Sequence, residues 1–144
     1  MAGPYTDDDW IVGQSEDDDG VLIVRCRSRL PEPDRRAAWP HLVLVGWSYE
    51  PEPDAGLPSE RENALMNRFE EAVSASVEEA GRGVLVASIL GGGAREWRYY
   101  AQDPDAFMDV LNAGLEGHPE YPLDFRAFED PEWDALAEVL PDEA

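Results

Sequence analysis

The chain has 144 residues, which is enough for one domain with a sizeable hydrophobic core. It carries 32 acidic residues against 11 arginines, with no lysine, and its formal net charge is −21. This charge argues against nonspecific binding to nucleic acid or to an anionic membrane, because phosphate contact needs positive side chains. A hydrophobic fraction of 43% argues against a disordered chain.

The acidity has three open explanations: a solvated surface, a basic protein partner, or a salt-rich environment. The single cysteine, Cys26, forbids an internal disulfide and fits a reducing cytoplasm. The opening "MAGPYTDDDW" has neither the basic nor the apolar region of a signal peptide, and no segment approaches the length of a membrane span. We therefore expect a soluble cytoplasmic protein that does not bind membranes.

The first part of the chain predicts a β-hairpin. Residues 10–13 form a short candidate strand, and residues 21–29 alternate with the period of a second strand. The acidic segment "QSEDDDG" joins them as a turn. Residues 30–40, "LPEPDRRAAWP", are expected to form a loop, because their prolines disfavour both a helix interior and a central strand.

Residues 41–50 are strongly β-forming, and apolar side chains on both of their faces indicate a central strand. Ser59 and Glu62 then have the spacing of a capping box, which predicts the start of a helix. Gly81 is expected to end that helix. Its apolar residues recur at helical spacing and form the predicted buried stripe: Leu65, Phe69, Ala72, Val73 and Val77.

The second half continues with strands and helices in alternation. Residues 83–90 are apolar on both faces, which again indicates a central strand. The remaining predicted elements are a glycine turn at 91–93, a paired strand at 94–101, a helix from Asp103–Pro104, a strand at 121–128 and a short helix capped by Asp130 and Pro131.

From residue 41 the predicted order is therefore β-α-β-β-α-β. This order is typical of a ferredoxin-like α+β fold, in which two helices back one face of an antiparallel sheet. We expect one domain over residues 1–144, with the ferredoxin-like core at 41–128 and flexible ends at 1–9 and 141–144. The N-terminal hairpin should extend the sheet edge or cover part of its other face.

Three motifs invite a chemical interpretation, and each is weak. The acidic run before Gly20 resembles a calcium loop, but its last ligand position would be Cys26, where a hard cation needs a carboxylate. The triple glycine leads into a strand, whereas phosphate loops lead into a helix. His41 and His118 have no metal-ligand spacing, and Cys26 is expected to be buried and inert. We predict no catalytic residue, metal or cofactor.

Arginine and aromatic residues supply the candidate binding face. Arg25, Arg27 and Arg29 recur at every second position and are expected to share one side of their strand. They either form an anion-binding stripe or pair with the abundant carboxylates on a solvated edge of the sheet. On the later strands, one mixed face could meet a ligand or a partner, unless the N-terminal hairpin or the short helix with Trp133 packs over it; its residues are Trp47, Arg95, Trp97 and Tyr99.

The order of several landmarks resembles a known bacterial family. These landmarks are Trp10, "EDDDG", "VLIVR", "WPHLVLVGWSY", "GLPSE", "GVLVASILGGGAREWRYYA" and "DPEW". Together, from about residue 8 to 140, they resemble the family called domain of unknown function 695. The resemblance implies no known reaction. Some relatives carry a domain like the regulator of ribonuclease E activity B, which implies regulation through protein contact.

The leading hypothesis is a non-catalytic module that binds or regulates another protein, which could be basic. One alternative is a small-ligand binder or enzyme that uses the arginine and aromatic face. Another is an immunity protein or nucleic-acid mimic. A homodimer formed through the sheet is compatible with all three hypotheses.

Overall fold

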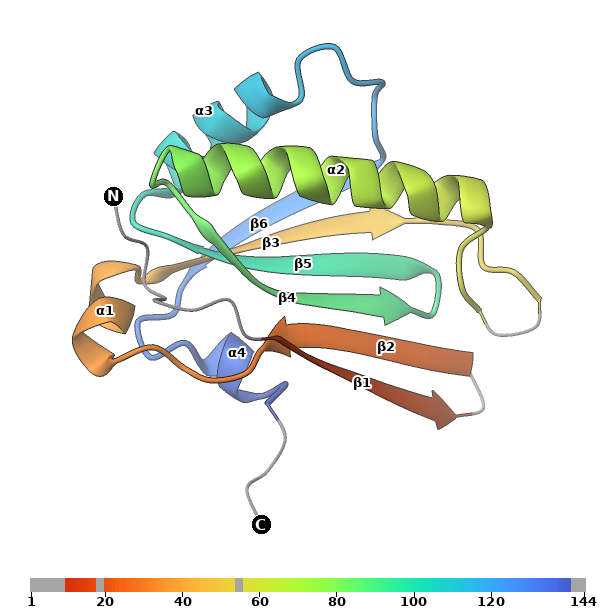
Figure 1. Ribbon diagram of the computed structural model, residues 1–144, viewed down its shortest axis with the longest axis horizontal. Helices are drawn as coiled ribbons and strands as arrows, with labels where there is room; N and C mark the ends of the chain where they lie inside the picture. Colours follow the sequence, from red (N-terminus) through yellow and green to blue (C-terminus); the bar gives the residue numbers. More distant parts are fainter. Residues whose placement is uncertain (1–9, 18–19, 54–55, 141–144) are drawn as a thin grey trace.

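The computed structural model describes residues 10–17, 20–53 and 56–140, which form an α+β fold (Figure 1). The strands are β1 (Trp10–Asp17), β2 (Gly20–Arg27), β3 (His41–Ser48), β4 (Val84–Gly91), β5 (Ala94–Ala101) and β6 (Leu123–Glu129). The helices are α1 (Pro33–Ala38), α2 (Glu60–Glu79), α3 (Pro104–Gly114) and α4 (Asp134–Ala137). The flexibility predicted for residues 1–9 and 141–144 lies outside the described residues.

The strands form one antiparallel sheet in the order β1-β2-β4-β5-β3-β6. Strands β3 and β4 each lie between two others, which confirms that apolar residues on both faces marked central strands. The β1–β2 hairpin pairs with β4 and so extends the sheet at its edge. Strands β1 and β6 are the two edges of the described sheet.

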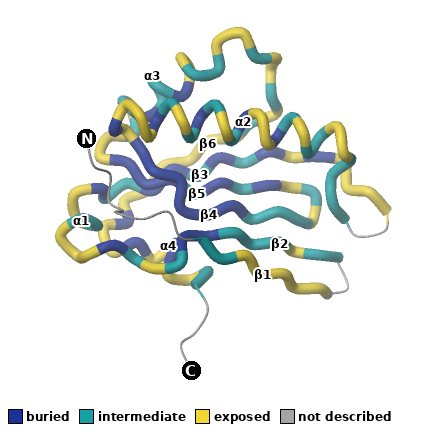
Figure 2. Tube along the Cα trace, in the orientation of Figure 1, coloured by how far each residue is buried: buried dark blue, intermediate teal, exposed yellow. Residues whose placement is uncertain are grey.

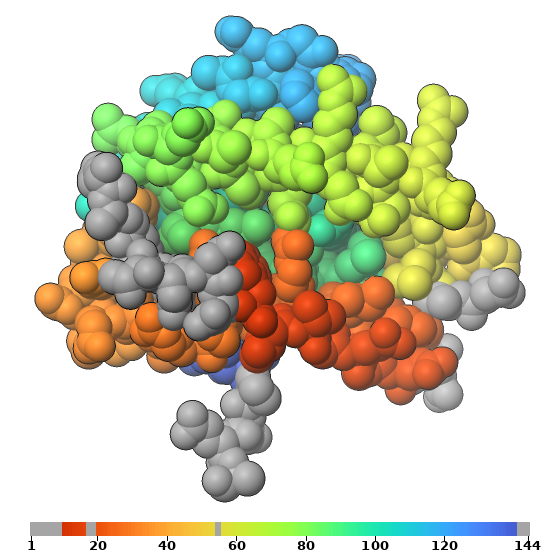
Figure 3. Space-filling view, in the orientation of Figure 1, coloured from red at the N-terminus to blue at the C-terminus, as the bar shows by residue number. Residues whose placement is uncertain are grey.

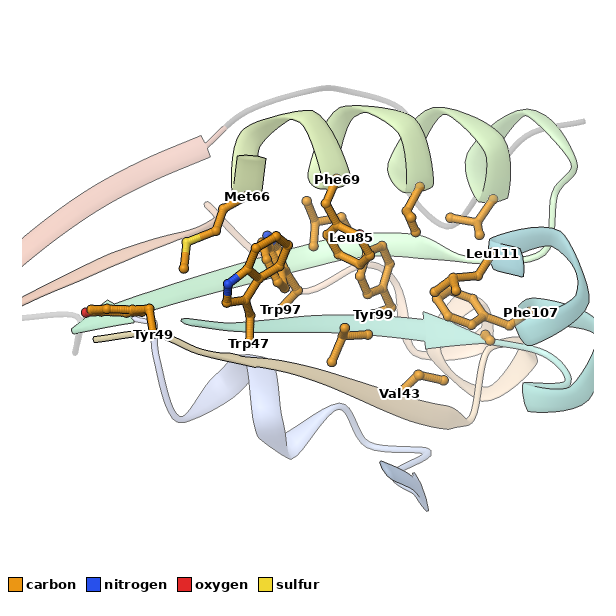
Figure 4. Packing of buried hydrophobic residues seen from close by; sticks show 14 residues of the cluster. Val43, Trp47, Tyr49, Met66, Phe69, Leu85, Trp97, Tyr99, Phe107 and Leu111 are labelled. Atoms are coloured by element: carbon orange, nitrogen blue, oxygen red, sulfur yellow. The ribbon is translucent and has the colours of Figure 1, made fainter. Parts of the chain in front are cut away.

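Helices α2 and α3 cover one face of the sheet and enclose the larger hydrophobic core (Figures 1 and 4). The α2 helix begins as predicted, because the Ser59 hydroxyl accepts a hydrogen bond from the Glu62 N–H at 3.2 Å. Three predicted stripe residues, Phe69, Val73 and Val77, are fully buried, and Met66 joins them. Leu65 and Ala72 are half-buried at the margin of this stripe.

The opposite face of the sheet carries a second core, built from the segments around α1 and α4. The Trp133 ring stacks on Tyr100 with centroids 4.0 Å apart and planes 4° from parallel. The Tyr100 hydroxyl donates a hydrogen bond to Asp130 at 2.5 Å. The same carboxylate accepts the N–H groups of Asp134 and Ala135 in the first turn of α4, although the N-cap residue of that helix is Trp133 and not Asp130 as predicted. The central strands are therefore buried on both faces (Figure 2).

A β-bulge in β4 decides which of its side chains face the helices. Leu85 lies opposite Tyr99, but Ala87 lies opposite Arg98, so Val86 is the extra residue. Beyond the bulge, the alternation of side chains is shifted by one position. Ser88 consequently faces α2, where its hydroxyl accepts a hydrogen bond from Arg95 Nε at 3.0 Å.

The structure corrects the predicted boundaries at three places. The segment 30–40 contains helix α1, because proline is favourable at the first position of a helix and Pro33 stands there. Strand β1 runs to Asp17, beyond the predicted end at residue 13, since it pairs with β2 along its whole length. Helix α4 is only four residues long and begins after Trp133, whose φ of 61° is left-handed.

The glycine turn between β4 and β5 has the predicted backbone. Gly91, Gly92 and Gly93 have φ angles of 151°, 66° and 91°, which L-residues with side chains rarely adopt. This turn passes from strand to strand and presents no helix N-terminus to a phosphate.

In the described part of the chain, no helix has the length and apolar character needed to cross a membrane.

The two buried tyrosines predict a loss of stability at alkaline pH. Burial raises the pKa of both Tyr99 and Tyr100 above the ordinary value of 10.0. Below about pH 10 the hydroxyls of both tyrosines stay protonated in the folded and in the unfolded protein, so the free energy of unfolding is unchanged. Above it the unfolded chain loses them first, and the free energy of unfolding should fall by up to about 1.4 kcal/mol per pH unit for each tyrosine.

Urea unfolding between about pH 9 and pH 11 would measure this slope. The Tyr99→Phe variant should show a shallower decline than the wild type, and the difference isolates Tyr99 from other titrating groups. Parallel slopes in the two proteins would contradict the prediction.

Candidate functional site

A groove runs between the β1–β2 hairpin and helix α2, on the face of the sheet that α2 covers. Figure 3 shows the hairpin, in red to orange, and α2, in green, bordering each other on the same side of the molecule. The groove contains a larger hollow of about 520 Å³ and a smaller one of about 160 Å³. Arg25 lines both, so we treat them together as the α2–hairpin groove. Its larger hollow is lined by Trp10, Arg25, Arg27, Glu70, Glu71, Ser74, Glu78 and Leu85.

Glu70 is the central acceptor of this groove. Its Oε1 accepts hydrogen bonds from Arg95 at 2.8 Å and from the Trp97 indole N–H at 2.9 Å. Its Oε2 lies 2.6 Å from a terminal nitrogen of Arg25. The Glu70 side chain is only 13% exposed, so one nearly buried carboxylate joins helix α2 to strands β2 and β5.

Arg95 is held on all sides by polar partners. Besides Glu70, it donates to Ser88 at 3.0 Å and to Asn67 at 3.1 Å. Its guanidinium carbon lies 4.8 Å from the centre of the Trp97 ring. Burial lowers the pKa of Arg95, and the adjacent Glu70 carboxylate opposes this shift by stabilising the cation. These contacts give Arg95 a structural role.

Arg25 and Arg27 both lie against the ring of Trp10, with guanidinium carbons 5.1 and 4.4 Å from its centre. Arg27 is 4% exposed, and its Nε donates to the Leu85 carbonyl at 3.0 Å. A terminal nitrogen of Arg27 is also 3.7 Å from Glu78. Arg25 differs from it, because its side chain is 36% exposed. Its Nε is buried without a hydrogen-bond partner among the described residues.

The structure brings together three of the predicted arginines. Arg25, Arg27 and Arg95 share the α2–hairpin groove and face carboxylates of α2. The expected solvated edge is wrong, because β2 lies between β1 and β4 and Arg27 is buried. Arg29 lies past the end of β2 and is exposed. Arg98 faces the other side of the sheet, where it bonds to Glu96 and to the Ala135 carbonyl.

The predicted aromatic residues occupy the core beneath α2. Trp47, Trp97 and Tyr99 are each at most 1% exposed, and Figure 4 shows them under the helix. The Trp47 indole N–H donates to Glu62 at 2.8 Å, and the Tyr99 hydroxyl pairs with Ser74 at 3.1 Å. Helix α2 therefore covers this face, whereas the sequence interpretation named the hairpin or the Trp133 helix as the covering element. Trp133 instead packs on the opposite face of the sheet, against Tyr100.

The sequence interpretation missed Glu70, although a signal was present. Beside its apolar stripe, α2 carries a second stripe of polar residues at helical spacing: Asn63, Asn67, Glu70, Ser74 and Glu78. These residues all line the α2–hairpin groove. A polar stripe next to an apolar one indicates a second, polar contact of the same helix. The sequence could not say which strand would supply the arginines.

Residues with other chemistry lie apart from the groove. Cys26 is 1% exposed on the opposite face of the sheet, and burial raises the pKa of its thiol. His118 lies in the loop after α3, where its Nδ1 is 2.8 Å from the Tyr121 hydroxyl. Within residues 10–17, 20–53 and 56–140, no cluster of His, Cys, Asp and Glu could hold a metal ion. The acidic turn once compared with a calcium loop includes residues 18–19, which lie outside the described part.

One of three comparisons with known proteins agrees with the resemblance noted in the sequence. The comparison with curated proteins and the comparison with solved structures each gave no match. A sequence profile for a family of unknown function matches residues 8–140. These residues include the β1–β2 hairpin, strands β3 and β4, and helix α4. The chain therefore belongs to the family of unknown function DUF695.

Proposed function

We propose that this protein is a non-catalytic module that binds a segment of another protein in the α2–hairpin groove. The observation that supports the proposal is the position and solvent exposure of Arg25. It lines both hollows and keeps 36% of its side chain exposed. The other two groove arginines are buried, so Arg25 is the cation in this groove that a partner could reach.

The residues around Arg25 restrict its side chain to a position where a partner's carboxylate could bind. The Trp10 ring and Glu70 restrict its guanidinium from two directions, which reduces the entropy lost on binding. On the helix side the rim is acidic, with Glu71 and Glu78 exposed.

The partner segment should therefore carry an acidic group flanked by basic side chains. The acidic group would bind Arg25, and the basic side chains would lie along Glu71 and Glu78. The net charge of −21 supports such a partner, because a negative surface attracts basic segments from a distance. This attraction is screened by salt, so binding should weaken as the ionic strength rises.

Affinity capture from native lysate at low and high salt tests the proposal. Wild-type bait should retain a specific partner at low salt, and the Arg25→Gln bait should lose most of it. Arg68→Gln is the matched control, since Arg68 is exposed on α2 and does not line the groove. Equal capture by the Arg25 variant, or the lack of any salt-sensitive partner, would refute the proposal.

A second candidate is a small carboxylate or phosphate ligand in the same groove. The larger hollow, about 520 Å³, falls in the range of roughly 300–1,000 Å³ that is usual for ligand sites. A thermal-shift screen of small anions would distinguish the two, because this candidate requires stabilisation that Arg25→Ala abolishes.

We also propose a fold class and a cellular compartment for this protein. We assign residues 41–128 to a ferredoxin-like core, to which the hairpin adds two strands. The strand order β4-β5-β3-β6 and the placement of α2 and α3 on one face support this assignment. The buried free thiol of Cys26 fits a reducing compartment, so we place the protein in the cytoplasm.

A further inference from the structure

Strand β6 is an edge strand with an unusual degree of exposure. Every residue from Asp124 to Glu129 is exposed, and the apolar rings of Phe125 and Phe128 are 36% and 48% exposed. Natural proteins usually protect such edges, because their free backbone groups can pair with another strand. The described part of the chain places no strand beyond β6.

The backbone groups of β6 that face outward follow from its pairing with β3. The Asp130 N–H donates to the Pro40 carbonyl at 2.7 Å, and the β3–β6 register places these two residues directly opposite each other. In an antiparallel pair, such bonded positions alternate with unbonded ones. The backbone groups of Asp124, Arg126 and Phe128 therefore point to β3, and those of Phe125 and Ala127 point outward.

The side chains of β6 are self-complementary around Phe125. If two copies pair antiparallel with Phe125 opposite Phe125, then Asp124 of each lies opposite Arg126 of the other. This position is an unbonded pair, in which side chains come closest. Within one chain, Asp124 and Arg126 are 3.7 Å apart and largely exposed, at 75% and 59%. Pairing would therefore form two ion pairs between chains without uncovering a buried charge.

The opposite face of the strand would also match. Leu123 packs against the core, and Phe125 lies opposite Val45, which faces the α2 side. In the pair, the two Phe125 rings would meet there and lose exposed apolar surface. The alternative centre at Ala127 would place Phe125 opposite Glu129 and Asp124 opposite Asp130. The Phe125 centre is the better match.

We propose that the protein forms a two-fold symmetric homodimer by antiparallel pairing of β6 with β6, centred on Phe125. The pairing joins two six-stranded sheets into one continuous sheet and closes the β6 edge. It leaves the α2–hairpin groove free, because that groove lies at the other end of the sheet order.

Sedimentation equilibrium across a concentration series tests the dimer. The wild type should reach twice the chain mass of 16.0 kDa. Asp124→Arg should be monomeric at the same concentration, since two arginines would then oppose each other at both pairs. The double variant Asp124→Arg with Arg126→Asp restores opposite charges and should recover the dimer. Glu16→Arg, a charge reversal on the opposite edge strand β1, is the matched control and should stay dimeric.

A second variant tests the backbone bonds. Ala127→Pro removes an outward N–H without touching the β3 ladder, so it should fold as a monomer. Circular dichroism would verify folding of each variant. A wild type that remains monomeric, a double variant that fails to recover the dimer, or mass that grows beyond two chains would overturn the proposal.

Discussion

Glu70→Ala is expected to lower the free energy of unfolding by about 3–5 kcal/mol, the range for breaking a buried ion pair from one side. The carboxylate accepts hydrogen bonds from Arg95 and Trp97 and pairs with Arg25. Its removal leaves the guanidinium of Arg95, a residue that is only 6% exposed, without its main anionic partner. Urea unfolding at neutral pH measures the change.

Glu71→Ala is the control for this prediction. Glu71 is the next residue on α2 and is exposed, so its removal should change stability by no more than about 0.5 kcal/mol. A double-mutant cycle with Glu70→Met and Arg95→Met separates the pair from general packing. The double variant should lose less stability than the two single losses added together, because neither charge then stays buried alone. Additive losses would contradict the role assigned to Glu70.

Trp133→Ala is expected to lower the free energy of unfolding by about 3–5 kcal/mol, which corresponds to a fall in Tm of roughly 10–17 °C. Its ring is fully buried, stacks on Tyr100, and donates through the indole N–H to the Trp39 carbonyl at 3.0 Å. Loss of the ring would open a cavity between the sheet and the α4 segment. Thermal unfolding followed by circular dichroism measures the effect.

Trp133→Phe should recover part of this stability, because a smaller ring can still stack on Tyr100 while the indole hydrogen bond is lost. Leu22→Ala is a suitable control, since Leu22 is 39% exposed on the hairpin. If Trp133→Ala melted within about 2 °C of the wild type, then the second core would contribute little to stability.

The arrangement of charge explains how a very acidic chain keeps positive residues together. Arg25, Arg27 and Arg95 project from strands β2 and β5, and the polar stripe of α2 lies directly above them. Arg95 and Arg27 are buried and held by contacts within the fold, whereas Arg25, which also pairs with Glu70, keeps 36% of its side chain exposed. Of the three arginines in the predicted stripe, Arg27 is buried and structural, Arg25 is partly exposed in the groove, and Arg29 is exposed past the end of β2.

Several features were predictable from the sequence because they depend on residues close together in the chain. The Ser59–Glu62 cap, the glycine turn at 91–93 and the internal positions of β3 and β4 all depend on local spacing and on which faces are apolar. The order of landmarks from about residue 8 to 140 also sufficed to indicate the family that the profile match supports. Helix α1 escaped prediction, since proline both disfavours helix interiors and favours the first helical position.

Only the tertiary structure decided the partners of these elements. The bulge at Val86 turns the Ser88 side chain toward Arg95. Helix α2 packs Phe69 on the aromatic face of the sheet and places Glu70 within hydrogen-bond distance of Arg95. Strands β2 and β4 pair although more than fifty residues separate them in the chain. The sequence by itself determined which segments become strands and helices, and which of their faces are apolar. Which helix packs on which face of the sheet depends on segments that are far apart in the sequence. The same packing decides which side chains are buried and which charges pair, so no local sequence pattern predicts it.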